Sequence, residues 1–142
     1  MKTIRVMLVE DNKEYREGIG LVLKHSRGID LISEFATSEV ALRSLQANSP
    51  SMPDLVLLDL RLPGMDGLES MPYFQSYAPD TKIIILTQSD SEEDVLRAIK
   101  RGAHLQILLD HQLTHCLIDL VLTVSCGCFP YRGRFGPQVT RS

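Results

Sequence analysis

The sequence predicts an α/β fold in which a parallel sheet is covered by helices on both faces. Two observations support this fold class. Five short apolar runs are rich in β-branched residues, as expected for strands buried on both faces of a parallel sheet. Segments with helical spacing of their apolar residues lie between these runs, so strands and helices alternate. Alternation of this kind implies right-handed strand–helix–strand crossovers.

The predicted strands are residues 4–9, 29–32, 55–60, 83–87 and 105–109. Four of the helices between and after them have an apolar face. The apolar residues of these four faces are, in chain order, Tyr15, Ile19, Val22 and Leu23; Val40, Ala41 and Leu45; Val95, Ala98 and Ile99; and Leu113, Leu117, Leu120 and Val124. The fourth helix has the clearest limits, with Ser91 and Asp94 as an N-terminal cap and Gly102 at its end. The third follows Asp66-Gly67 and includes Pro72, which must lie close to the helix start or distort the helix.

The composition is that of one globular domain with a short tail. The chain has 142 residues, of which 44% are hydrophobic and 23% are charged, enough for a single core. No segment approaches the ~20 continuous apolar residues that span a bilayer, and no signal-peptide cleavage site precedes the first strand. We therefore expect a cytoplasmic protein without membrane contact. Residues 1–125 are predicted to form the domain, and residues 126–142 a linker or tail.

The charge is distributed unevenly between these two parts. The net charge is −3, but residues 126–142 contain three Arg and no acid, so residues 1–125 hold 12 basic and 18 acidic side chains, a balance of −6. An acidic body argues against direct nucleic-acid binding by the domain. The three Cys are odd in number and lack zinc-site spacing. A redox or metal role for Cys126 and Cys128 stays open.

Acidic residues follow two of the predicted strands. Glu10 and Asp11 come directly after the first strand, and Asp59 lies at the end of the third. Ligands of a parallel α/β sheet bind beyond the carboxyl ends of its strands, so we expect these side chains to converge there. Three clustered carboxylates imply raised pKa values or a bound cation, and Mg²⁺ is the natural candidate.

A simpler interpretation exists for the first pair, because Asp11 or Asn12 could merely cap the next helix. Asp59 shifts the balance toward a site, since a buried lone Asp would cost several kcal/mol without a partner. The turn at Pro63-Gly64 is predicted to expose Asp59. Thr87 ends the fourth strand at the same edge, where its hydroxyl could donate to a phosphoryl oxygen or could simply favour the strand.

Three blocks of sequence resemble the receiver domain of two-component response regulators, and within that family the NarL/FixJ subfamily of transcriptional regulators. The blocks are VMLVEDN at residues 6–12, PDLVLLDLRLPGMDGLE at residues 53–69 and KIIILTQSDSEEDVLRAIKRGA at residues 82–103. The resemblance covers roughly residues 4–110. It implies a flavodoxin-like, doubly wound (βα)₅ sandwich with strand order 2-1-3-4-5, and a sensor histidine kinase that donates a phosphoryl group.

The resemblance also implies a role for each site residue. Asp59 would be the phosphoacceptor, and Glu10 and Asp11 would hold Mg²⁺ together with it. The backbone carbonyl of Arg61 would be a further metal ligand, and Thr87 would bind the phosphoryl group as the switch hydroxyl. Such a transfer needs charge neutralisation and in-line positioning more than covalent catalysis. The domain would thus be a phosphorylated signalling module rather than an enzyme.

Two positions depart from the family pattern Gly-Ala-x-Gly-Tyr-Leu-Leu-Lys-Asp. Leu109 stands where the family has a Lys that pairs with the acceptor, and Gln106 replaces an aromatic residue that rotates inward during switching. A missing charge-assisted hydrogen bond is worth about 1.5–3 kcal/mol, so we expect weakened or rewired signalling rather than loss of phosphorylation. The alternative is a pseudo-receiver, an interaction module whose switch is phosphate-independent.

The resemblance makes predictions about partners as well. It implies a homodimer through the face of the fourth helix, fifth strand and fifth helix, where Leu105, Ile107 and Cys116 are interface or core residues. DNA would be bound only through a helix-turn-helix output domain, which this chain is expected to lack, since residues 125–142 resemble the linker before it. A third reading, a flavin-binding protein of similar fold, conflicts with Glu10 and Asp11, which would repel a phosphate in the first loop.

Overall fold

The protein is a parallel five-stranded sheet with helices on both faces. The computed structural model describes residues 3–47, 52–87, 97, 100, 105–108 and 121. Its elements are β1 (Ile4–Val9), α1 (Lys13–Lys24), β2 (Ile29–Phe35), α2 (Ser38–Gln46), β3 (Leu55–Asp59), α3 (Gly67–Tyr77), β4 (Lys82–Thr87) and β5 (Leu105–Leu108). The strand order is β2-β1-β3-β4-β5, and every neighbouring pair is parallel. The predicted flavodoxin-like fold class is confirmed.

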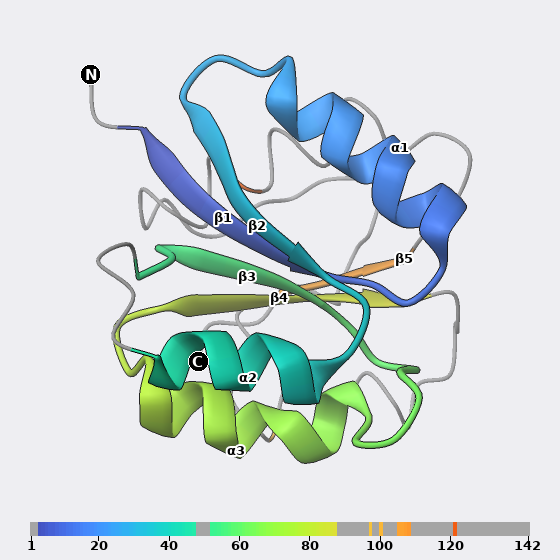
Figure 1. Ribbon diagram of the computed structural model, residues 1–142, viewed down its shortest axis with the longest axis vertical. Helices are drawn as coiled ribbons and strands as arrows, with labels where there is room; N and C mark the ends of the chain where they lie inside the picture. Colours follow the sequence, from blue (N-terminus) through green and yellow to red (C-terminus); the bar gives the residue numbers. More distant parts are fainter. Residues whose placement is uncertain are drawn as a thin grey trace.

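Two apolar layers, one on each face of the sheet, form the core. Helices α2 and α3 cover one face and α1 covers the other (Figure 1). Successive residues of β3 alternate between the layers: Val56 and Leu58 pack toward α2 and α3, whereas Leu55 and Leu57 pack toward α1. Both sets are fully buried, which explains why the strand reads as an unbroken apolar run.

Strand β2 is longer than predicted. It was expected to end at Ile32 but continues to Phe35. The pairing with β1 shifts after Leu31, so that Met7 pairs with Ser33. Because β2 lies at the edge of the sheet, its outer positions accept polar side chains and its apolar pattern is broken. Strand β3 is shorter than predicted, since it ends at Asp59 rather than at residue 60.

Three helix predictions need correction. Tyr15 and Val40 were placed on buried helix faces, yet they are 45% and 46% exposed. The apolar stripes of α1 and α2 are therefore narrower than predicted. Pro72 does not lie at the start of α3, since the helix begins at Gly67 and continues through Pro72 to Tyr77. Met71 and Phe74, next to it, are fully buried, and this packing offsets the lost hydrogen bond.

The later part of the chain is only partly described. Residues 97, 100 and 121 are helical, and Val121 is buried in the same layer as Ile19 and Leu23 of α1. The predicted caps of the fourth helix, Ser91, Asp94 and Gly102, lie outside the described residues. So do most of the fifth helix and the tail at residues 126–142.

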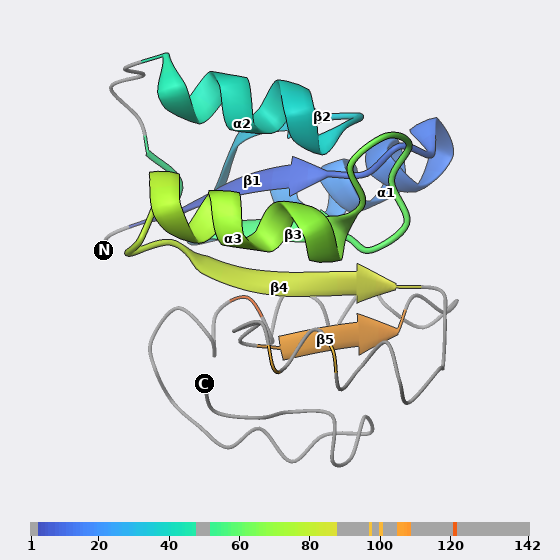
Figure 2. The same ribbon diagram turned by 90° about the horizontal axis from the view of Figure 1, so that it is seen from below.

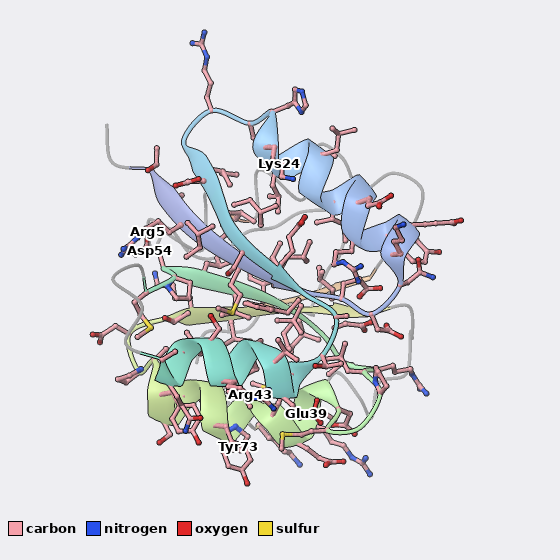
Figure 3. The ribbon with its side chains drawn as sticks, viewed as in Figure 1. Arg5, Lys24, Glu39, Arg43, Asp54 and Tyr73 are labelled. Atoms are coloured by element: carbon pink, nitrogen blue, oxygen red, sulfur yellow. The ribbon has the colours of Figure 1, made fainter. Side chains whose placement is uncertain are left out.

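The sheet has an ion pair at the end opposite the carboxyl ends of its strands. All strands point the same way, so their carboxyl ends lie along one edge (Figure 2). At the other edge Arg5 and Asp54 lie side by side (Figure 3). Asp54 accepts hydrogen bonds from both the backbone amide and the guanidinium of Arg5, at 2.9 Å and 3.2 Å. This pair joins β1 to the start of β3 away from the site.

Candidate functional site

Three carboxylates converge at the carboxyl edge of the sheet. Glu10 and Asp11 follow β1, and Asp59 is the last residue of β3, which pairs with β1. Each offers one oxygen, and these three oxygens lie within 4.8 Å of one another. Glu10 and Asp59 are 1% and 8% exposed, whereas Asp11 is exposed. The strand pairing thus brings together residues that are 49 positions apart.

The cap of α1 is formed by Asn12 and not by Asp11. The Oδ1 atom of Asn12 accepts a hydrogen bond from the backbone amide of Tyr15 at 3.1 Å. This is the usual geometry of an N-cap. Of the two residues predicted as possible caps, Asn12 therefore forms the cap, and capping explains neither Glu10 nor Asp11.

The electrostatics of the cluster favour a proton or a cation. Burial, with a hydrogen bond to Asp59 and repulsion from Asp59 and Asp11, raises the pKa of Glu10 to about 9. Burial raises the pKa of Asp59 as well, against the lowering effects of its hydrogen bonds with Glu10 and the Arg61 amide. Glu10 is thus the member that holds a proton at neutral pH when no cation neutralises the cluster.

The donor set fits a hard divalent cation. Among the residues described, Oε2 of Glu10 is buried and has no hydrogen-bond partner, which is costly for a carboxylate oxygen. The cluster contains carboxylate oxygens and no sulfur or imidazole. Mg²⁺ is typically held by one or a few carboxylates while it keeps several waters, and exposed Asp11 leaves room for such waters.

The loop between β3 and α3 forms one wall of the site. The backbone amide of Arg61 donates to Oδ1 of Asp59 at 3.1 Å, and Asp66 caps α3 through the amide of Glu69 at 2.8 Å. Gly64 has a φ of 73°, as the predicted turn requires. The turn does not expose Asp59 as predicted, because this residue is 8% exposed. Its side chain is hydrogen-bonded to Glu10, and Gly67 packs against its backbone carbonyl.

A pocket opens beside the acidic cluster. Its volume is about 550 Å³, and its lining consists of Asp11, Leu60, Arg61, Leu62, Pro63, Asp66, Leu68 and Arg97. The lining joins the cluster, through Asp11, to the loop that follows β3.

The remaining predicted site residues are placed only in part. Thr87 is the last residue of β4, and the register pairs the preceding Leu86 with Asp59. The backbone of Thr87 therefore lies at the same edge, but its side chain lies outside the described residues. Gln106 lies in β5, paired with Ile85. Leu109 and Cys116 lie beyond the described part of the chain.

Two residues of the site region were not predicted from the sequence. Arg16 in α1 donates from Nη1 to the backbone carbonyls of Glu10 and Asp11, at 2.8 Å and 3.4 Å. Glu39 in α2 accepts a hydrogen bond from the Met65 amide at 2.6 Å. Arg16 follows the acidic turn by one helical turn, which was an available clue. Nothing in the pattern links Glu39 to a loop 26 residues away.

Comparison with known proteins establishes the family. Residues 6–115 match the family model described as the response regulator receiver domain. The chain therefore belongs to the response regulator receiver family, and its relatives make it NarL/FixJ-like. The nitrate/nitrite response regulator NarL of Escherichia coli K12 is 31% identical over 105 residues, covering 74% of this chain and 47% of the relative. An uncharacterized transcriptional regulatory protein of Bacillus subtilis, YhcZ, is 33% identical over 107 residues, covering 75% and 49%.

A solved structure supports the same assignment. The signal receiver domain of NarL from Mycobacterium tuberculosis superposes with a TM-score of 0.79 at 28% identity, covering 89% of this chain and 99% of that one. The chain spans about half the length of the curated relatives it matches. Among the described residues, no helix has the length and apolar character needed to cross a membrane.

Proposed function

We propose that this receiver domain accepts a phosphoryl group on Asp59 from a sensor histidine kinase and thereby switches an output. The observation that carries the proposal is the convergence of Glu10, Asp11 and Asp59 with one buried Glu10 oxygen left unpartnered. An acidic cluster that served only as a helix cap would not need this arrangement, because Asn12 already caps α1.

Mg²⁺ is the cation that we propose for the cluster. Glu10, Asp11 and Asp59 would hold it, together with the backbone carbonyl of Arg61. When bound, it would neutralise the negative charge shared by the phosphoryl oxygens and the carboxylates. Two buried carboxyl groups favour such a cation, because without it Glu10 must keep a proton for the site to avoid two unpartnered buried charges.

The residues of the chain itself supply the nucleophile and its orientation. A carboxylate oxygen of Asp59 would form the new bond to phosphorus while the bond from phosphorus to the kinase imidazole nitrogen breaks. The Arg61 amide on Oδ1 restricts rotation of the Asp59 side chain, which favours in-line attack. Thr87, at the end of the adjacent strand, is proposed to donate its hydroxyl to the phosphoryl group as the switch residue.

The output and the partners are proposals at the level of the whole protein. The match covers only about half of the length of these relatives, and two of the matched proteins are described as transcriptional regulatory proteins. We propose that phosphorylation controls a DNA-binding domain outside this chain. We also propose a homodimer through the face that contains β5 and the helices on either side of it.

Acetyl phosphate provides the direct test. Incubation of the full chain with acetyl phosphate and Mg²⁺ should add the mass of one phosphoryl group, and Asp59→Asn should prevent the addition. Asp30→Asn is the matched control, because Asp30 is an exposed carboxyl on β2. No mass gain in the wild-type chain at saturating phosphodonor would defeat the proposal.

A pseudo-receiver is the second candidate, and the replacements at Leu109 and Gln106 favour it. In that case the chain would bind its partner without a phosphorylation switch. Beryllofluoride, which mimics the phosphoryl group, separates the two. A live switch should shift the amide resonances of Thr87 and the residues that follow it, whereas a pseudo-receiver should show shifts confined to the residues around Asp59.

A further inference from the structure

The middle of the β3–α3 loop is bonded to a helix that has no part in the proposed site. The Met65 amide donates to Oε1 of Glu39, in the first turn of α2, at 2.6 Å. Figure 3 shows Glu39 at the end of α2 nearest this loop. Thr37 caps α2 through the amide of Val40, so capping does not require the Glu39 side chain.

The carboxylate of Glu39 also lies against the turn itself. A Cβ atom added to Gly64 would lie 2.6 Å from Oε1 of Glu39, and Gly64 already needs its positive φ of 73°. The hydrogen bond from Met65 lowers the pKa of Glu39, so its carboxylate is charged at neutral pH. The backbone of the turn thus donates a hydrogen bond to a charged acceptor, and such a bond is stronger than one between neutral groups.

The position of this turn bears on Asp59 through a short stretch of backbone. The Arg61 amide holds Oδ1 of Asp59 at one end of the loop, and the Gly67 amide donates to the carbonyl of Leu60 at the other, at 2.8 Å. Between these two anchors, Pro63 and Gly64 are exposed. A bond from Met65 to α2 therefore restrains the segment that carries the Arg61 carbonyl.

We propose that Glu39 is a positioning residue for phosphorylation: its bond to Met65 fixes the β3–α3 loop so that the Arg61 backbone is held toward Asp59 and the metal. This inference rests on the proposed function of the site. Partners of metal ligands typically change affinity by about 10–100-fold. Because the loop keeps its two end anchors, we expect a smaller effect for Glu39.

The test compares three variants of the full chain. Glu39→Ala should weaken Mg²⁺ binding by about threefold to tenfold and slow phosphorylation by acetyl phosphate, and Glu39→Gln, which keeps an oxygen acceptor, should recover part of both. Glu69→Ala is the matched control, since Glu69 is the first-turn acid of α3 and is exposed. The chain has no Trp, so Mg²⁺ is titrated by amide chemical shifts, at a temperature where urea titration shows every variant fully folded.

The outcomes separate this inference from the proposed function. Amide hydrogen exchange in the metal-free chain should accelerate at Met65 and Arg61 in Glu39→Ala, but not in Glu69→Ala. A Glu39→Ala variant with wild-type Mg²⁺ affinity, phosphorylation rate and Arg61 exchange overturns the positioning role and leaves the function intact. A wild-type chain that neither binds Mg²⁺ nor accepts a phosphoryl group overturns the function, and with it the positioning role.

Discussion

Asn12 caps α1 by accepting the amide of Tyr15 at 3.1 Å, and the neighbouring Asp11 is thereby left to the acidic cluster. Asn12 thus contributes to stability, whereas the adjacent Asp11 belongs to the proposed metal site. Substitution of each residue in turn can therefore separate stability from metal binding. Asn12→Ala should lower the free energy of unfolding by about 1 kcal/mol, the usual value of an N-cap. Its Mg²⁺ affinity should stay close to that of the wild type.

Asp11→Ala should have the opposite effects. It removes an exposed carboxylate that repels Glu10 and Asp59. The free energy of unfolding should therefore change by no more than about 0.5 kcal/mol. Loss of a proposed ligand should weaken Mg²⁺ binding by at least about tenfold. Urea titration and chemical-shift titration of both variants measure the two effects. A stability loss in Asp11→Ala equal to that in Asn12→Ala would contradict the division of roles.

The packing of Gly67 against the end of β3 predicts a sensitive position. A Cβ atom there would contact the carbonyl oxygen of Asp59 and lie 2.8 Å from Cα of Leu60. Gly67→Ala should therefore destabilise the fold by about 1–3 kcal/mol, as overpacking of a core does. It should also weaken Mg²⁺ binding, because relief of the clash must move the backbone of Asp59.

Gly18 offers the matched control for this substitution. It lies within α1, and a Cβ atom there would meet nothing within 4 Å. Gly18→Ala should stabilise the protein by about 0.5–1 kcal/mol through helix propensity alone. Thermal or urea unfolding distinguishes the two. Equal effects of both substitutions would show that the contact of Gly67 with the strand is unimportant.

Much of the fold could be predicted because burial determines which positions of a strand or helix must be apolar. Leu55 to Leu58 are fully buried on both faces, and such strands must be continuously apolar. The convergence of the carboxylates could be anticipated for a related reason, since parallel strands end at one edge. Prediction failed where tertiary context overrides local preference, as at Pro72 within α3 and at the outer positions of β2.

The parts of the site that escaped prediction depend on contacts distant in sequence. The bond between Glu39 and Met65 joins two elements whose spacing is set by the packing of α2 beside α3. No periodicity reports such a distance. Burial of Asp59 was missed for the same reason, because the turn at Gly64 was interpreted without the chain that folds over it.

Mg²⁺ should stabilise the folded chain at neutral pH. Binding to the folded state alone at a concentration of one hundred times the Kd adds about 2.7 kcal/mol, and a chelator should reverse the gain. Thermal unfolding with and without Mg²⁺, at equal ionic strength in KCl, measures this effect. Asp59→Asn should lose most of it and Asp30→Asn none. An unchanged unfolding temperature in the wild-type chain at high Mg²⁺ concentration would argue against a metal site.

Without metal, stability should fall as the pH rises from about 4.5 to about 9, because the folded state keeps a proton on Glu10 that the unfolded chain releases near pH 4.5. The unfolded state then binds fewer protons than the folded state, which makes the slope of stability against pH negative in this window. The raised pKa of Asp59 adds to the same trend. Urea unfolding in the presence of a chelator across this range measures the slope, and Glu10→Gln should flatten it.

The stabilisation by Mg²⁺ should grow with pH, because the cation must displace the proton on Glu10. A metal effect that does not depend on pH would mean that Glu10 is not a ligand.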